Sequence, residues 1–270
     1  MSWRNIARKD IYEAKRSTGI WLFSALSIVL FVGYALVHTY LGESTFAAFT
    51  VGLARVTAVC LPLLGLLLGY KSIIHERTNG SLFLVLSAPQ SRKDLVVGTM
   101  VGRVLVLLVP TLVSIALAGA VGAIRYGTEG ALYYPWFLLV TALYGVAFVG
   151  LAVGLSLSTT VDRWITLGAF GGYVLLVPFW NSFHSLTMLV LHRFDVGVFA
   201  DMPDWALLFR LSTPTEAYYR LLNVGFDINK AARYLGGPVY VDWWMGLVVL
   251  LAWCVLPMVL GYQRFETADL

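Results

Sequence analysis

Charge is scarce in this sequence: of its 270 residues, only 13% are Asp, Glu, Lys or Arg, whereas 59% are hydrophobic. A chain with so little charge cannot give a domain the usual polar surface, so the composition predicts an integral membrane protein. Asp and Glu are absent from all of the long apolar stretches. This absence argues against the carboxylate relay of an ion-coupled transporter and against the aspartyl pair of an intramembrane protease.

Cysteines are few, and a nucleotide-binding motif is missing. The two cysteines, Cys60 and Cys254, fall near the middle of apolar stretches, which excludes an extracellular disulfide framework and predicts small buried side chains. No Gly-x-x-x-x-Gly-Lys-Ser/Thr motif occurs, and the glycine spacing within residues 65–71 is wrong for a phosphate loop. The chain is therefore predicted not to be an enzyme and not to hydrolyse ATP.

Metal-ligand patterns are incomplete. Residues 75–79 read His-Glu-Arg-Thr-Asn, which lacks the second histidine of the zinc motif His-Glu-x-x-His. His184, Met188 and His192 could in principle meet a metal ion, but scattered histidines are common in interfacial helices, and we favour that interpretation. The sequence predicts no metal site and no cofactor bound by this chain.

The sequence contains six continuous apolar runs. A helix needs about 20 apolar residues to cross a hydrocarbon core, and continuous rather than alternating runs exclude barrel strands. We therefore predict an all-α integral membrane protein with six transmembrane helices in a single transmembrane domain over residues 19–270. The predicted spans are 19–40, 47–70, 95–124, 131–158, 164–183 and 243–262.

The distribution of Lys and Arg predicts the orientation of these spans. Basic residues are held in the cytoplasm when they lie in short loops near span ends. They collect before the first span and between the second and third, whereas the alternate short loops offer only Arg125. We expect a multi-pass protein of the cell membrane with both termini in the cytoplasm and residues 181–242 outside. The net charge of +4 then reflects anchoring, and no nucleic-acid partner is predicted.

Residues 1–18 carry a helical pattern of their own. Apolar side chains recur at helical spacing from Trp3 to Ala14, with Arg and Lys on the other side. This pattern predicts an amphipathic interfacial helix that binds membrane lipid. It fits either a plain topology anchor or an elbow that braces the membrane domain against a cytoplasmic partner.

A charged insert over residues 71–94 separates the second span from the third. Its apolar residues, among them Leu82 and Leu86, predict a short cytoplasmic helix that needs a groove on another protein. Ser91 and Asp94 form a capping-box pattern, in which the serine oxygen accepts from the Asp94 N–H while the carboxylate reaches back. The third long helix is expected to start there.

The insert resembles the cytoplasmic loop of the membrane subunits of type-2 ABC exporters. In that family the loop reads Glu-Arg-Glu-x-Gly-Thr-Leu and then Leu-Leu-Ser-x-Pro-x-Ser-Arg. This chain reads Glu-Arg-Thr-Asn-Gly-Ser-Leu over residues 76–82 and Val-Leu-Ser-Ala-Pro-Gln-Ser-Arg over residues 85–92. It departs from the pattern at Thr78, where the family has a second acid, and at Ser81, where the family has Thr. Further along, Thr99 stands where a lysine is usual. Residues 212–222 and the tail over 261–270 are also similar to that family.

The resemblance implies a permease subunit, similar to those of copper-enzyme maturation and of multidrug or lipid export. Two copies of a cytoplasmic ABC ATPase would bind ATP and Mg and drive it, and a second permease subunit would complete a homodimer or a closely related heterodimer. The alternative is a non-transporting membrane scaffold or an ATPase-linked membrane regulator. The residues that the resemblance assigns to ATPase coupling are Glu76, Arg77, Gly80, Leu82, Leu86, Ser87, Pro89, Ser91 and Arg92.

Two arginines lie well inside predicted spans. A charge near the bilayer centre costs about 2.5 to 3.5 kcal/mol on insertion scales, so Arg55 and Arg103 are candidates for a translocation path. Both also lie near enough to a span end to snorkel or to form a structural hydrogen bond. An anionic substrate or lipid is the other candidate partner. The substrate itself stays open.

Two further expectations concern packing. Glycines spaced four apart at 65 and 69, 98 and 102, and 150 and 154 permit close helix approach, and we favour packing within the chain over a dimer seam. The segment 181–242 is long and rich in aromatic residues, which predicts folded helices on the membrane face rather than a flexible tether.

Overall fold

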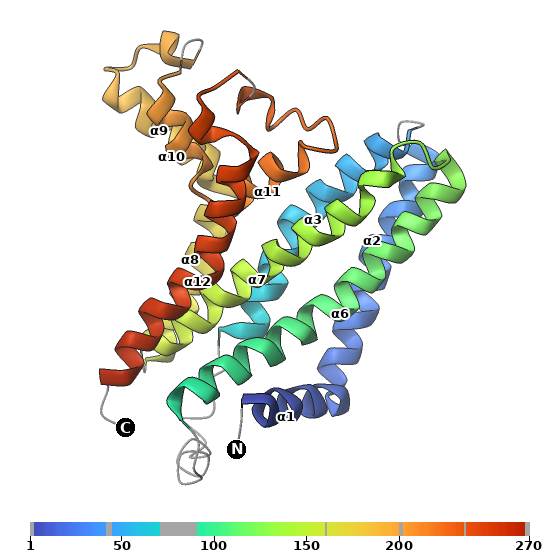
Figure 1. Cartoon of the computed structure of the whole chain (residues 1–270), viewed down its shortest axis with the longest axis vertical. Helices are drawn as coiled ribbons and strands as arrows, with labels where there is room; N and C mark the ends of the chain where they lie inside the picture. The colour runs from blue at the N-terminus through green and yellow to red at the C-terminus, as the bar shows by residue number, and fades with distance from the viewer. Residues whose placement is uncertain are drawn as a thin grey trace.

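The computed structural model describes residues 3–41, 45–70, 91–159, 161–199, 202–234 and 236–267 (Figure 1). Apart from short turns and loops, these residues are helical, and none of them forms a strand. Helices satisfy each backbone N–H and C=O within one segment, which an apolar surrounding requires. The prediction of an all-α membrane protein is confirmed.

Six helical segments in the described part of the chain are long and apolar enough to cross a membrane. They agree with the six predicted spans, although most begin or end a few residues away from the predicted limits. A shorter helix, α1 (Trp3–Arg16), precedes them. The spans are α2 (Thr18–Leu41), α3 (Phe46–Gly69), α6 (Arg92–Tyr126), η1 (Ala131–Tyr133) with α7 (Tyr134–Ser158), α8 (Asp162–Val174) with η2 (Leu175–Phe179) and α9 (Trp180–Leu191), and α12 (Trp243–Thr267).

Helix α7 occupies the centre of the bundle and packs against α3, α6 and α12. The beginning of α6, the end of α12 and the whole of α1 lie together at the lower end of Figure 1, which we call the α1 end. Helices α9, α10 (Asp204–Leu211) and α11 (Pro214–Leu222) lie at the opposite end, which we call the α11 end. Short turns η3 (Val196–Phe199), η4 (Ala232–Tyr234) and η5 (Val239–Val241) complete that part.

The fifth span is longer than predicted. It was expected to end at residue 183, but α8, η2 and α9 run on as one helical segment to Leu191. A π-helical turn containing Pro178 joins the two halves, and proline cannot donate a backbone hydrogen bond. In the same turn, the carbonyl of Leu176 accepts a hydrogen bond from the Thr215 hydroxyl of α11 at 3.0 Å. The bulge is therefore stabilised from another helix.

The segment 181–242 folds into helices, as predicted, and one of these, α11, packs against the long helices of the bundle. All of its residues are buried, and it packs against α7 and α12. The ring of Tyr218 stacks on Tyr144 of α7 with 4.4 Å between centroids. The Tyr144 hydroxyl lies 2.9 Å from the Ala58 carbonyl and 3.0 Å from the Thr215 hydroxyl. Thr215 and Tyr218 of α11 therefore have hydrogen-bond partners within the protein.

The three glycine pairs face helices of the same chain, which confirms packing within the chain. A Cβ atom on Gly69 would lie 2.6 Å from Ala152 of α7, and one on Gly98 would lie 2.6 Å from Ile6 of α1. A Cβ atom on Gly150 would lie 2.8 Å from the Cys254 carbonyl of α12. Such distances are too short for any side chain, so glycine is what allows these backbones to approach.

Candidate functional site

The charged insert is described only where it joins α6. Residues 71–90 lie outside the described residues, and with them lie the proposed coupling residues Glu76, Arg77, Gly80, Leu82, Leu86, Ser87 and Pro89. Ser91 and Arg92 are described, and together with Asp94 they form the junction between the insert and the membrane helices. We call these three residues the insert root.

Ser91 is the N-cap of α6. Its backbone is extended, with φ −80° and ψ 151°, and its side-chain oxygen accepts from the Asp94 N–H at 3.1 Å. The Ser91 hydroxyl in turn donates to Asp94 Oδ2 at 2.7 Å. The predicted capping box is confirmed with one difference, because the carboxylate receives the serine hydroxyl instead of a backbone N–H. A negative charge in the first turn also complements the helix dipole.

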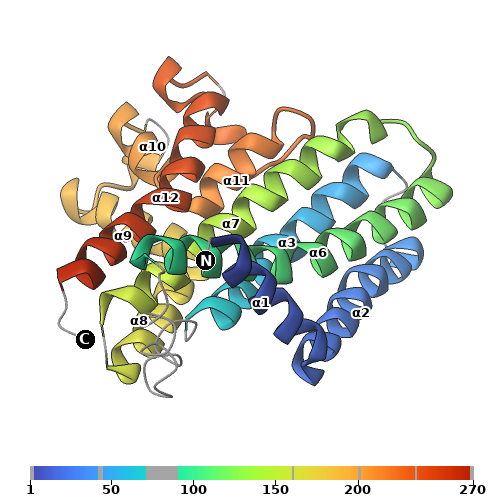
Figure 2. The same cartoon turned by 60° about the horizontal axis from the view of Figure 1, so that its bottom comes forward.

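The second carboxylate oxygen of Asp94 reaches another helix. Asp94 Oδ1 accepts from the backbone N–H of Trp3 at 3.3 Å. The first N–H groups of a helix have no partner within it, so Asp94 caps α1 as well as α6. Figure 2, with the α1 end turned forward, shows α1 beside the beginning of α6.

Arg92 connects the insert root to α12. Its Nη1 donates to the carbonyl oxygens of Phe265 at 2.8 Å and Glu266 at 2.9 Å, and the guanidinium lies 5.4 Å from the centroid of the Phe265 ring. The last carbonyls of a helix lack partners within it, and a cation there also complements the dipole. The resemblance assigns Arg92 to ATPase coupling, and in this structure its side chain binds the end of α12.

Three helices therefore meet at the insert root. Asp94 holds the beginning of α1 and Arg92 holds the end of α12, while Ser91 and Asp94 fix the first turn of α6. The insert root is thus a polar junction between the ends of three helices that are far apart in the sequence.

The N-terminal helix is fixed to α6 along its length. Ile6 and Ala7 are buried, and Ile6 packs where Gly98 leaves room. One turn further along each helix, Asp10 packs on Gly102 and forms an ion pair with Arg103, with 3.2 Å between Oδ2 and Nε. Burial raises the pKa of Asp10, and the positive charge of Arg103 opposes that rise.

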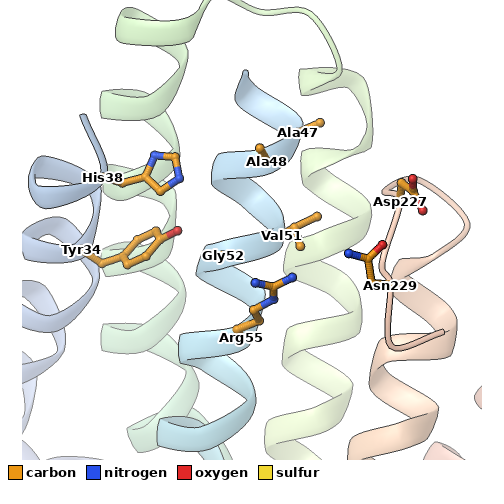
Figure 3. A pocket seen from close by; sticks show the side chains of 9 residues that line it. All are labelled: Tyr34, His38, Ala47, Ala48, Val51, Gly52, Arg55, Asp227 and Asn229. Carbon is orange, nitrogen blue, oxygen red and sulfur yellow. The ribbon is translucent and has the colours of Figure 1, made fainter. Parts of the chain in front are cut away.

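Arg103 thus has an ion-pair partner within the chain, although its Nε makes no hydrogen bond to the residues that the structure describes. Arg55 differs, because it forms no hydrogen bond or ion pair with any residue that the structure describes. Its side chain is exposed and lines a cavity of about 590 Å³ near the α11 end (Figure 3). Arg103 lines a different cavity, beside α1, so the structure does not bring the two arginines together.

A buried charge cluster formed by residues between 210 and 234 was not predicted. Glu216 of α11 and Arg210 of α10 form an ion pair of 3.5 Å, with side chains 3% and 6% exposed. The Tyr234 hydroxyl donates to the same carboxylate oxygen at 2.8 Å. The Thr213 hydroxyl caps α11 by accepting from the Glu216 N–H, and this Thr-x-x-Glu pattern was the available sequence signal. The cluster fixes α10, α11 and η4 to one another.

Six long apolar helices, with glycine contacts between them and a polar joint at one end, define a multi-pass helical membrane subunit. The chain matches the model of a family described as ABC-2 family transporter protein over residues 4–270. It therefore belongs to the ABC-2 transporter family and is an ABC transporter permease subunit of the type-2 class.

Two proteins similar to this chain in sequence are also named as ABC transporter permeases. The chain is 30% identical over 275 residues to the probable ABC transporter permease protein NosY of Stutzerimonas stutzeri, and 97% of each chain is covered. It is 29% identical over 235 residues to the probable ABC transporter permease protein NosY of Pseudomonas aeruginosa, with 84% of this chain and 83% of the relative covered.

Proposed function

We propose that this permease subunit forms the translocation path of an ABC exporter and is driven by a separate cytoplasmic ABC ATPase that binds the insert. The observation that carries the proposal is the attachment of the insert root to α12 and α1 through Arg92 and Asp94. Through these bonds the first turn of α6, where the insert ends, is tied to the beginning of α1 and to the end of α12, so a force on the insert would reach three helices.

The proposed mechanism passes force from the insert to the bundle. ATP and Mg bound between two ATPase copies would close them against each other and push on residues 71–90. The bonds of Arg92 would carry that push to α12, which packs closely on α7 through Gly154 and Gly261. Close backbone packing makes these two helices a stiff pair, so they would tilt together and change access to the path.

The proposed orientation places the α1 end in the cytoplasm. Arg4, Arg8, Lys9, Lys15 and Arg16 lie in or next to α1, and the positive-inside rule assigns such a cluster to the cytoplasmic side. The ends of α3 and α12 and the beginning of α6 lie at the same end of the bundle. We further propose that two permease subunits assemble, as a homodimer or closely related heterodimer, and that Arg55 faces the path.

Charge reversal in the insert tests this function. We expect Glu76→Lys combined with Arg77→Glu to abolish co-purification of the ATPase with the tagged permease from its native membranes. The matched control reverses two exposed residues of opposite charge, Arg125 in the last turn of α6 and Glu129 in the loop before η1, and should leave the ATPase bound. Retention of the ATPase by the insert variant at the level of the control would overturn the proposed coupling.

A further inference from the structure

The cavity around Arg55 lies between three parts of the chain. Tyr34 and His38 come from α2, Val51 and Arg55 from α3, and Asn229 from the segment after α11 (Figure 3). Its volume of about 590 Å³ is within the usual range for small-ligand sites. We call it the Arg55 cavity.

The charge of Arg55 is the first argument for a ligand. A guanidinium stays charged at any physiological pH, and Arg55 has no ion-pair partner among the described residues. It lies nine residues after Phe46, at which α3 begins, or about 13 Å along the helix. A cation at that distance from the helix end requires either water or an anion beside it.

The neighbouring polar groups are the second argument. The Asn229 amide makes no hydrogen bond within the described part of the chain, and Figure 3 shows it and the Arg55 guanidinium pointing toward each other across the cavity. Both groups donate hydrogen bonds, and a guanidinium matches the geometry of phosphate oxygens. Asp227 also lines the cavity, but it forms no ion pair with Arg55, and its carboxylate is turned away from it in the same view.

The electrostatic surroundings also favour an anion. Lys230 follows Asn229 and lies 4.7 Å from the centroid of the Tyr219 ring. Partial burial lowers the pKa of Lys230, Glu216 opposes this, and the positive charge of Arg55 lowers the pKa further. Lys230 does not line the cavity but lies near enough to act on Arg55, so these two cations outnumber the one lining carboxylate, Asp227, and favour an anion.

We propose that the Arg55 cavity binds a phosphate group, held by Arg55 and Asn229. Two sources carry this chemistry, namely the headgroup of a phospholipid in the leaflet at the α11 end and a soluble phosphate. The apolar side chains of Val51 and of its neighbours Ala47 and Ala48 line the rest of the cavity, as the glycerol and chain region of a lipid requires. The site does not depend on the direction of transport or on the ATPase.

Photo-crosslinking tests the site. The full-length protein is reconstituted in phosphatidylcholine nanodiscs that contain a phospholipid with a photoactivatable group near its phosphate, and labelled peptides are identified by mass spectrometry. We expect labelling of α2 and α3 peptides around the cavity. Arg55→Gln should reduce it about tenfold, as the loss of a charge-assisted contact does, whereas Arg55→Lys should retain most of it.

Two further variants complete the design. Arg125→Gln removes an exposed cation at the same end of the bundle and should leave labelling unchanged. Ala48→Phe fills the cavity without touching the charge, so it should also abolish labelling, and it keeps the test decisive if Arg55→Gln does not fold. Unchanged labelling in either Arg55→Gln or Ala48→Phe would overturn the proposal.

Competition distinguishes the two sources. If excess inorganic phosphate removes the label from the wild-type protein, a soluble phosphate occupies the site, whereas unchanged labelling assigns the site to a phospholipid. Labelling that is absent from α2 and α3 in the wild-type protein, together with no protection of these helices from hydrogen exchange by inorganic phosphate, would exclude both.

Discussion

Arg92 donates from Nη1 to the carbonyl oxygen of Phe265 at 2.8 Å, and the two residues are 173 positions apart in the sequence. One residue begins α6, near the end of the charged insert, and the other lies in the last turn of α12. Because the same nitrogen also donates to Glu266, the two helix ends are joined by two bonds. The proposed path of force from the insert into the bundle begins at this connection.

Replacement of Arg92 tests the connection. We expect Arg92→Gln to bind the ATPase normally but to lose the effect of nucleotide on the membrane helices, because the push no longer reaches α12. The lost bonds are partly exposed, so the free energy of unfolding should fall by only about 1 kcal/mol. Hydrogen exchange at the end of α12, measured with and without ATP, reports the loss. Lys93→Gln, which removes the adjacent exposed cation, should behave as wild type, and equal behaviour of the two variants would contradict the role of Arg92.

The ion pair between Asp10 and Arg103 predicts a dependence of stability on pH. Burial raises the pKa of Asp10 above 3.8, and the opposing charge of Arg103 limits the rise. The native state therefore holds its proton more tightly than the unfolded state does. The free energy of unfolding should fall as the pH increases from 3.8 through the raised pKa, and this contribution should stay constant above it.

Substitutions separate the two partners of this pair. Arg103→Gln leaves a carboxylate that is 11% exposed without its cation, so we expect a loss of about 1 to 3 kcal/mol at neutral pH and a steeper pH dependence. Asp10→Asn removes the buried charge, so it should cost less and should abolish the pH dependence. Thermal unfolding at acidic and neutral pH measures both effects. If Asp10→Asn is as harmful as Arg103→Gln and retains the pH dependence, the assignment is wrong.

The sequence predicted the structural features that depend on residues close together in the chain. Six runs of about 20 apolar residues suffice to locate spans, and the spacing of Ser91 and Asp94 predicts a cap. The close glycine contacts also follow from spacing, because residues four apart share a helix face. Each of these signals lies within a few residues of the feature that it predicts.

The features that sequence analysis missed depend on contacts between distant segments. No local pattern connects Arg92 to Phe265 or Arg103 to Asp10. The sequence of α11 does not show that Glu216 is buried, because the residues that contact its carboxylate, Arg210 and Tyr234, lie in other segments. The fifth span was ended too early because polar side chains after residue 180 lower the hydropathy of a helix that continues.

Two glycine substitutions, one in the contact between α7 and α12 and one in open space on α8, should have opposite effects on stability. A Cβ atom on Gly154 would overlap the carbonyl of Pro257, so Gly154→Ala should separate the helices and cost about 1 to 3 kcal/mol. Gly171 in α8 has open space around it, and Gly171→Ala should stabilise the protein by about 0.5 to 1 kcal/mol through helix propensity. Thermal unfolding in detergent compares the two. A stabilised Gly154→Ala variant would show that the helices do not pack as described.

The central claim is that the insert contacts an ATPase supplied by another polypeptide. A photoreactive amino acid at Leu82, in the native membranes, tests this contact most directly, with Val239 as an exposed control at the α11 end. We predict an adduct at Leu82 with a protein that carries a nucleotide-binding glycine loop, and no such adduct at Val239. The absence of that adduct at Leu82, together with labelling of this position by a membrane-impermeant reagent from outside the cell, would contradict the account.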